Sequence, residues 1–338
     1  MLKRAHWPIL MLTLALAGCG GGGGGGSGTP APTTSTSSNT SNVITIAPGA
    51  GPAGGTSTSS GTSSGSATAT GQPINVSGLS YPQGIAVYGS TLYVANTNGQ
   101  SISAISLTPP NYPVTSIQLN YVKNGAPQLT QPTGLAVSQD GKTLYAANWT
   151  SPNSTGGAFI DAIDITTGAV TPLASGLNNP DGLALSADGN SLFVANHGYG
   201  DVRQISTIDG TTIATYTYPA SSAAYPWSVY ADNNYVYATN SNGTVSKWSI
   251  VSSGIPSSQP TTVATLTSPS GITKANGYLY VADYQAETIN KIDLTSTPPT
   301  VVATVSVNPR QPFFLAHDNT YLYFTDGNSG SVNAIPLP

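Results

Sequence analysis

The most constraining feature of this 338-residue sequence is a motif that returns six times after residue 80. Each copy contains a proline. In the clearest copies a variable residue and a glycine follow the proline, and then come aliphatic residues and alanine. The prolines are Pro82, Pro132, Pro180, Pro226, Pro269 and Pro312, so successive copies start 50, 48, 46, 43 and 43 residues apart. A period of about 40 to 50 residues is that of β-propeller blades. Six copies therefore predict six blades.

A second short run follows each copy and consists of aromatic and β-branched residues. These runs end at Asn96, Asn148, Asn196, Asn240, Asp283 and Asp326. Their short length and high β-propensity predict strands, and their continuous apolar character predicts burial on both faces, as between stacked blades. Only 7% of the residues are charged, while Gly and Pro are abundant, which favours strands and turns over long helices.

Two further strands can be identified after most of these runs, but the sixth repeat is followed by too few residues for a fourth strand. Ile74 to Leu79 precede the first repeat and have the length and composition of a strand. We expect this segment to pair with the sixth blade, which would close the ring and cover two exposed strand edges. The prediction is an all-β fold, a six-bladed β-propeller of four-stranded blades in residues 73–338, closed by an N-terminal strand.

The repeated motifs resemble those of a known class of propellers. Pro-x-Gly-Leu-Ala-Val, followed by Leu-Tyr-Val-Ala-Asn or Asp, is similar to NHL-repeat and YVTN-type β-propellers, and the similarity covers all six repeats. The resemblance implies the fold. It does not choose among functions, because propellers of this type include binding platforms, cell-surface proteins, lyases and lactonases.

The N-terminus has the layout of a bacterial lipoprotein signal peptide. Lys3 and Arg4 form a positively charged region, and an apolar run of about ten residues follows from Trp7 to Leu16. Leu16-Ala17-Gly18-Cys19 then resembles the lipobox, in which the cysteine carries a diacylglycerol. We expect residues 1–18 to be a cleaved signal peptide and Cys19 to be lipidated. By the same resemblance, Gly20 after the cysteine indicates an outer-membrane lipoprotein at the bacterial cell envelope.

Residues 19–72 contain almost only Gly, Ser, Thr, Ala and Pro. Such a composition cannot bury enough apolar surface to offset the entropy of ordering. We interpret this segment as a disordered tether between the lipid anchor and the propeller.

Candidate site residues are those at which the repeats differ near the propeller axis. The residue after each proline is Gln83, Thr133, Asp181, Trp227, Ser270 or Phe313. Asp181, Trp227 and Phe313 stand out in an otherwise small, polar ring and could form a binding platform for a planar or sugar-like ligand. Alternatively, the two aromatic rings plug the channel.

The turns after the second strands add Trp149, His197 and Tyr284. Trp149 opens the longest of these turns, and long loops on a rigid scaffold are common functional locations. His197 with Asp201 could form a base and its orienting carboxylate, but no nucleophile lies in a recognisable motif, so we assign no catalytic residue.

Metal binding is a further possibility, because the Asn and Asp residues that end the second strands would offer six oxygen ligands. Their recurrence in every blade is better explained by structural Asx-turns. Resemblance to gluconolactonase-type propellers would imply a metal held by a glutamate, asparagines and an aspartate near the axis. The one glutamate here, Glu287, falls in an outer turn. We predict no metal and no cofactor.

Function is the least constrained prediction. The net charge of −4 and the lack of a basic patch argue against nucleic-acid binding. We expect a monomeric module, attached to the membrane through its lipid anchor, that binds a protein or glycan at the envelope. The alternative is a lactonase-like hydrolase or a lyase that acts on a small molecule at the same face.

Overall fold

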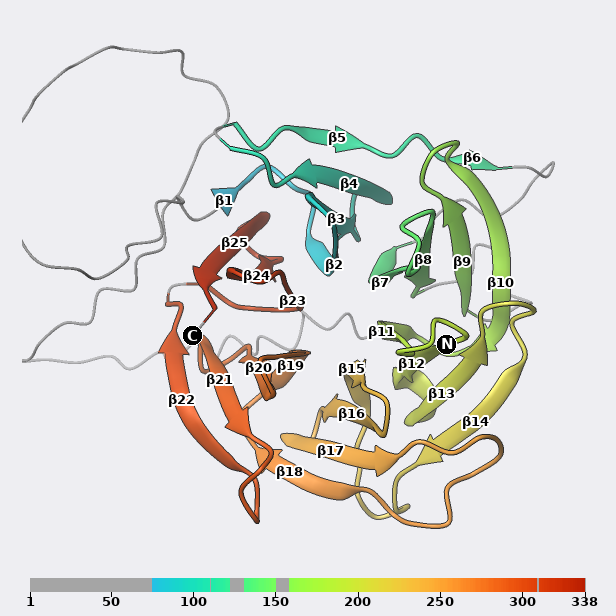
Figure 1. Ribbon diagram of the computed structural model, residues 1–338, viewed down its shortest axis with the longest axis vertical. Helices are drawn as coiled ribbons and strands as arrows, with labels where there is room; N and C mark the ends of the chain where they lie inside the picture. Colours follow the sequence, from blue (N-terminus) through green and yellow to red (C-terminus); the bar gives the residue numbers. More distant parts are fainter. Residues whose placement is uncertain (1–74, 110, 122–130, 150–157, 309, 338) are drawn as a thin grey trace, which may run out of the picture. The chain divides into compact units, whose positions relative to one another are not determined.

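The structure is a computed structural model that describes residues 75–109, 111–121, 131–149, 158–308 and 310–337. Within this part, six sheets of mainly antiparallel strands surround a central axis, and the strand at or just after each repeated proline is innermost (Figure 1). The predicted six-bladed β-propeller is confirmed. The predicted signal peptide, Cys19 and the tether lie outside the described residues.

The blades follow one another along the chain. The first comprises β2 (Pro82–Tyr88), β3 (Thr91–Asn96), β4 (Ser101–Ser106) and β5 (Val114–Ser116). The second comprises β6 (Asn120–Tyr121), β7 (Pro132–Val137), β8 (Thr143–Asn148), β9 (Ala158–Asp164) and β10 (Ala169–Leu177). The third comprises β11 (Pro180–Leu185), β12 (Ser191–Asn196), β13 (Asp201–Ser206) and β14 (Thr212–Thr217), with the short 3-10 helix η2 (His197–Tyr199) between β12 and β13.

The other three blades repeat this arrangement. The fourth comprises β15 (Pro226–Ala231), β16 (Tyr235–Asn240), β17 (Thr244–Ser249) and β18 (Thr261–Thr265). The fifth comprises β19 (Pro269–Ala275), β20 (Tyr278–Asp283), β21 (Thr288–Asp293) and β22 (Thr300–Ser306). The sixth comprises β23 (Leu315–His317), β24 (Tyr321–Asp326), β25 (Ser331–Pro336) and β1 (Asn75–Val76). Across the described residues, no helix is long and apolar enough to cross a membrane.

The ring closes as the sequence predicts. β1 pairs antiparallel with β25, with Asn75 opposite Asn333 and Val76 opposite Val332. The side chain of Asn75 donates a buried hydrogen bond of 2.9 Å from its Nδ2 to Oδ1 of Asn333. The backbone N–H of Leu79 continues the contact by donating to the carbonyl of Gly330. The first strand of the fold thus completes the last blade.

The second blade differs from the four-stranded prediction. Its outer strand β10 also pairs in parallel with β6, which makes a fifth strand of two residues. The chain between β5 and β6 runs from the edge of the first blade to the edge of the second (Figure 1). No repeat pattern marks this crossing, because it falls between two copies of the motif.

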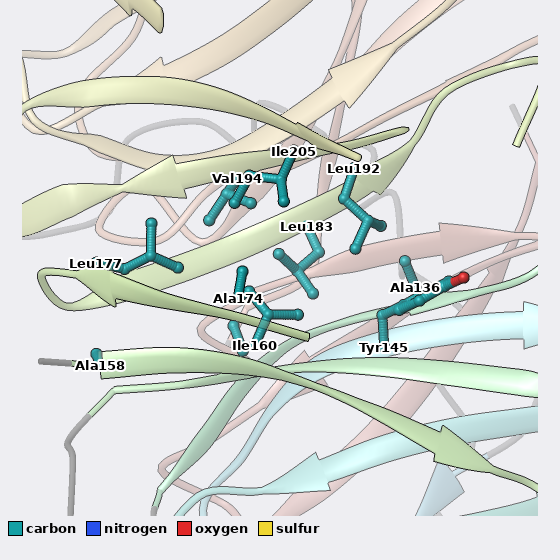
Figure 2. Packing of buried hydrophobic residues seen from close by; sticks show 11 residues of the cluster. Ala136, Tyr145, Ala158, Ile160, Ala174, Leu177, Leu183, Leu192, Val194 and Ile205 are labelled. Atoms are coloured by element: carbon teal, nitrogen blue, oxygen red, sulfur yellow. The ribbon is translucent and has the colours of Figure 1, made fainter. Parts of the chain in front are cut away.

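The hydrophobic core lies between the blades, as the apolar second strands predict. One cluster joins the second and third blades and includes Tyr145, Ile160, Leu177, Leu192 and Val194, all buried (Figure 2). Equivalent clusters lie between other neighbouring blades. Each sheet is therefore covered on both faces by its neighbours, and the axis is built from the first residues of the six inner strands.

Glycines near the start of the inner strands let adjacent blades approach the axis closely. A Cβ atom on Gly84 would lie 1.8 Å from the carbonyl oxygen of Thr133, and one on Gly134 would lie 2.2 Å from that of Asp181. No side chain fits at those distances. The same packing holds the variable residue before each glycine in a fixed place at the axis.

Candidate functional site

One layer of six side chains closes the axis at the face where the inner strands begin. These are the residues after the repeated prolines, Gln83, Thr133, Asp181, Trp227, Ser270 and Phe313, and all six are buried. Trp227 is 7% exposed and Phe313 is 1% exposed, so these two rings fill the axis instead of presenting open faces. The burial favours the plug interpretation for these two residues.

A second layer surrounds the first and comes from the turns after the second strands. The backbone N–H of the first turn residue donates to the carbonyl of the residue before the proline, as for Trp149 with Gln131 and Tyr284 with Ser268. His197 occupies the same repeat position in the third blade. Trp149, His197 and Tyr284 therefore lie around the axial layer, as predicted from the repeat alignment.

Side chains in or next to these two layers join each blade to the next by hydrogen bonds to the carbonyls of the repeated prolines or of the residues that follow them. Thr97 donates to Pro132, Thr133 to Pro180, His197 to Pro226, Thr239 to Ser270, Ser270 to Pro312, and Thr325 to Gln83. All six interfaces have such a bond. His197 thus carries out in the third blade the structural role that threonine or serine has elsewhere.

This bond defines the chemical state of His197. Its Nδ1 lies 3.2 Å from the carbonyl oxygen of Pro226, and a carbonyl can only accept, so we assign the proton to Nδ1. Burial lowers the pKa of the imidazole to about 4, although the bond to Pro226 acts in the opposite direction. His197 is therefore neutral near pH 7, with the lone pair on Nε2.

His197 is also the centre of an aromatic cluster. Its ring stacks on Trp227 with centroids 3.8 Å apart, and Trp149 and Tyr225 lie at 6.0 and 5.7 Å. We call these four residues the His197 cluster. Tyr225 is 46% exposed, whereas Trp227 is buried, so the cluster extends from the axis to the surface. Tyr225 directly precedes a repeated proline, a position that the sequence analysis did not consider.

The pairing of His197 with Asp201 that the sequence allowed, and that we did not adopt as a catalytic prediction, is not formed. Asp201 accepts a 2.7 Å hydrogen bond from Nδ2 of Asn196 and lies 3.4 Å from Nε of Arg203. Arg203 in turn lies over the ring of Tyr199. The Asp201 carboxylate therefore orders its own blade, and the pair does not form a base with its orienting acid.

A second aromatic group surrounds Phe313. The ring of Tyr284 meets it edge-on with centroids 5.0 Å apart, and the ring of Tyr81 does so at 6.0 Å. Tyr81 reaches over the sixth blade at Gly327, where a Cβ atom would lie 3.2 Å from the tyrosine ring. The sequence analysis missed Tyr81, although, like Tyr225, it is an aromatic residue directly before a repeated proline.

Polar atoms without partners gather beside this second group. Among the described residues, the Tyr81 hydroxyl, Oε1 of Gln83 and Oδ1 of Asp181 are buried and have no hydrogen bond of normal geometry. Burial raises the pKa of Asp181 well above its usual range, and no charged group offsets it. Burial raises the pKa of Tyr81 as well, and the Tyr284 hydroxyl and Asp181 add to that rise, whereas a contact with the Gln83 side chain acts in the opposite direction. Both shifts favour the protonated, uncharged forms of Asp181 and Tyr81.

A cavity of about 240 Å³ lies at the other end of the channel. It is lined by residues further along the inner strands of all six blades, among them Val87, Leu183, Tyr230 and His317. The polar atoms without partners lie instead in the layer where the strands begin. That layer is the better candidate for specific recognition.

The residues that could hold a metal do not assemble as gluconolactonase-type propellers would require. Glu287 accepts a hydrogen bond from Asn308 and lies in the turn between β20 and β21. The residues that end the second strands bond locally: Asn196 accepts from the backbone of Asn178, and Asp283 from that of Thr267. Within the described ranges, no three His, Cys, Asp or Glu side chains form a group suited to a metal. The donor set does not fit such a centre.

Comparison with known proteins agrees with the fold. The family model described as "SMP-30/Gluconolactonase/LRE-like region" matches residues 110–242, under half of the chain. No curated protein matches this sequence.

Solved structures with the same fold come from proteins of different functions. Virginiamycin B lyase from Staphylococcus aureus is 16% identical, with a TM-score of 0.54 over 79% of this chain and 99% of that one. A chain of a nidogen–laminin complex is 18% identical, with a TM-score of 0.58 over 74% and 90%. Hydrazine synthase from Kuenenia stuttgartiensis is 16% identical, with a TM-score of 0.54 over 82% and 99%. At these identities the similarity shows the fold alone.

Proposed function

We propose that this six-bladed β-propeller is a binding module whose recognition face is the one where the inner strands begin. The observation that carries the proposal is the His197 cluster, which connects a rigid, buried axial layer to the exposed ring of Tyr225. Aromatic side chains held in place by packing provide contact area at low entropic cost. The protein is a lipid-anchored module of the bacterial envelope, and its ligand is a protein or a glycan.

Replacing Tyr225 with alanine should weaken ligand binding at least tenfold, because exposed aromatic residues beside a buried centre often dominate binding energy. The measurement uses the full-length chain, a glycan array, and photo-crosslinking from position 225 in cells. Ile208 is the matched control, since it is 85% exposed and lies in the turn between β13 and β14 at the opposite face. Equal binding by Tyr225→Ala and wild type, or equal crosslinking from positions 225 and 208, would contradict the proposal.

Cys19→Ser should release the protein from the membrane fraction, because the acyl chains at this residue are the proposed anchor. Membrane fractionation with detection by immunoblot measures the effect. Gly20→Asp serves as the companion variant: it keeps the cysteine and, by resemblance to other lipoproteins, should move the protein from the outer to the inner membrane. If the Cys19→Ser variant stays in the membrane fraction, the proposed lipid anchor is contradicted.

An enzymatic function is the second candidate, and the family-model match over residues 110–242 favours it, because that region contains Asp181 and His197. A neutral imidazole and an uncharged carboxyl group are chemically suited to proton transfer. Thermal melting with calcium or zinc, followed by a screen for lactone hydrolysis, tests this candidate. A large, saturable increase in melting temperature together with turnover would favour the enzyme.

A further inference from the structure

The polar atoms beside Phe313 indicate what kind of ligand the proposed binding face would bind. Among the described residues, Oδ1 of Asp181 is buried at the axis without a hydrogen-bond partner, and the Tyr81 hydroxyl and Oε1 of Gln83 have none beyond the contact between the Tyr81 and Gln83 side chains. A buried polar atom left without a partner costs about 1 to 3 kcal/mol. The Asp181 oxygen, with two under-bonded polar groups beside it, indicates a position where another molecule supplies the missing hydrogen bond.

The chemistry of these atoms favours a donor. Oε1 of Gln83 can only accept hydrogen bonds, an ionised Asp181 would also only accept, and the Tyr81 hydroxyl can do either. A group that matches them therefore presents several hydrogens and no lone pair, which describes an ammonium group.

The surroundings also favour an organic cation. The rings of Tyr81, Tyr284 and Phe313 form one aromatic group next to the three oxygens. Aromatic faces attract ammonium groups, most strongly where water is excluded. Tyr81 and Tyr284 are half-buried, so their rings reach the surface. A ligand that approaches Asp181 from this face would pass both rings. Asp181 is the single carboxylate that the described residues place in the axial layer, and it would balance one positive charge.

We propose that Asp181, Gln83 and Tyr81 bind a primary ammonium group on a slender aliphatic chain, as provided by a lysine side chain of a partner protein. The inference rests on the proposed binding function and specifies the ligand of its axial face. The ammonium group pairs with the Asp181 carboxylate, and the aliphatic chain lies between the rings of Tyr81 and Tyr284.

This mode of binding releases a proton. Burial raises the pKa of Asp181 well above its usual range, so pairing with an ammonium group should release the proton from whatever fraction of this carboxyl group is protonated in the free protein. The Tyr81 hydroxyl, and beside it that of Tyr284, are the other titratable groups close to Asp181, and both have raised pKa values and keep their protons. Binding should therefore strengthen by up to about tenfold per pH unit for as long as the free carboxyl group is protonated.

Isothermal titration calorimetry of the full-length chain with Nα-acetyl-lysine methylamide tests the proposal, with the norleucine analogue as a neutral probe. We expect binding of the lysine probe at least tenfold tighter, with a net release of protons, at most one per complex, measured in buffers of different ionisation enthalpy. Asp181→Asn should remove both effects. Asp161→Asn, which removes another buried carboxyl group away from the axis, should leave them unchanged.

The outcomes separate this inference from the proposed function. Equal affinity for both probes, or proton release that persists in Asp181→Asn, would overturn the ammonium site. Binding of glucose and glucosamine to the same extent would replace it with a site for sugar hydroxyls, and a calcium-dependent melting shift lost in Asp181→Asn would replace it with a metal. In each of these cases a Tyr225-dependent partner could still be detected, and the binding function would stand.

Discussion

Deleting residues 73–79 should lower the melting temperature by about ten degrees, because the deletion opens the propeller ring. β1 supplies the outer strand of the sixth blade, and its loss exposes the edge of β25. It also removes the donor to Oδ1 of Asn333, a fully buried residue, at a cost of about 1 to 3 kcal/mol. Together with the lost strand pairing, a destabilisation of about 3 to 5 kcal/mol is expected, and each kcal/mol corresponds to roughly 2 to 4 °C in a domain of this size.

Scanning calorimetry at several protein concentrations measures the effect. A deletion of equal length at residues 55–61, within the predicted tether, is the matched control and should leave the melting temperature unchanged. The exposed β25 edge should also make the shortened chain associate through its strands, which makes its melting depend on concentration. An unchanged melting temperature after deletion of residues 73–79 would mean that β1 does not hold the ring together.

The periodic part of the fold could be predicted from the sequence because each blade repeats the same local requirements. Five of the six repeated prolines are the first residues of inner strands, and the Asn or Asp residues mark the ends of the second strands. Glycines such as Gly84 are required where a neighbouring backbone approaches the axis. The fifth strand β6 could not be predicted, since a two-residue parallel pairing depends on how two blade edges meet and has no pattern of its own.

The sequence could predict which residues lie at the candidate site, but not which of their side chains contact one another. The repeat alignment indicates which residues face the axis, and so identified Asp181, Trp227 and Phe313. It cannot indicate that Tyr81 would turn over Gly327 or that His197 would stack on Trp227, because such contacts depend on side-chain conformations across blade boundaries. The residue before each proline is Tyr, Gln, Asn or Ser, and the importance of the two tyrosines emerges only from the three-dimensional arrangement.

Replacing Asp161 with asparagine should remove a pH dependence of stability that the buried carboxyl group imposes. Asp161 in β9 is fully buried, and burial raises its pKa from 3.8 to about 7, although a 3.1 Å hydrogen bond from Nδ2 of Asn148 acts in the opposite direction. Its other oxygen has no partner among the described residues. One pKa unit corresponds to about 1.4 kcal/mol, so ionising Asp161 in the folded chain costs on the order of 4 kcal/mol.

The sign of the effect follows from proton binding. Between about pH 4 and pH 7 the folded chain keeps the Asp161 proton that the unfolded chain has lost, so the free energy of unfolding falls as the pH rises through this window. Below pH 4 both states are protonated, and the group contributes no difference. Asp161→Asn should therefore match wild type near pH 4 and become progressively more stable than wild type up to about pH 8.

Other blades show which substitutions the site accepts. Asp161 lies opposite Ala146, and the equivalent residues are Ser103 in the first blade and Asn290 in the fifth. In the first blade, Nδ2 of Asn96 donates to Oγ of Ser103 at 2.9 Å, as that of Asn148 does to Asp161. Asp161→Ser is therefore a second variant that should preserve the hydrogen bond without introducing a charge.

Urea unfolding of wild type and variants between pH 4 and pH 8 measures the difference. Asp164→Asn, at the exposed end of the same strand, is the matched control with the opposite sign. Hydrogen bonds from Thr167 lower the pKa of Asp164, so this residue adds stability that is lost as the pH falls below 4, and its replacement should lower stability near neutral pH. If Asp161→Asn and Asp161→Ser both follow the wild-type curve in parallel, Asp161 ionises in the folded blade without cost. Solvent would then reach the Asp161 carboxyl group in β9 and hydrate its ionised form.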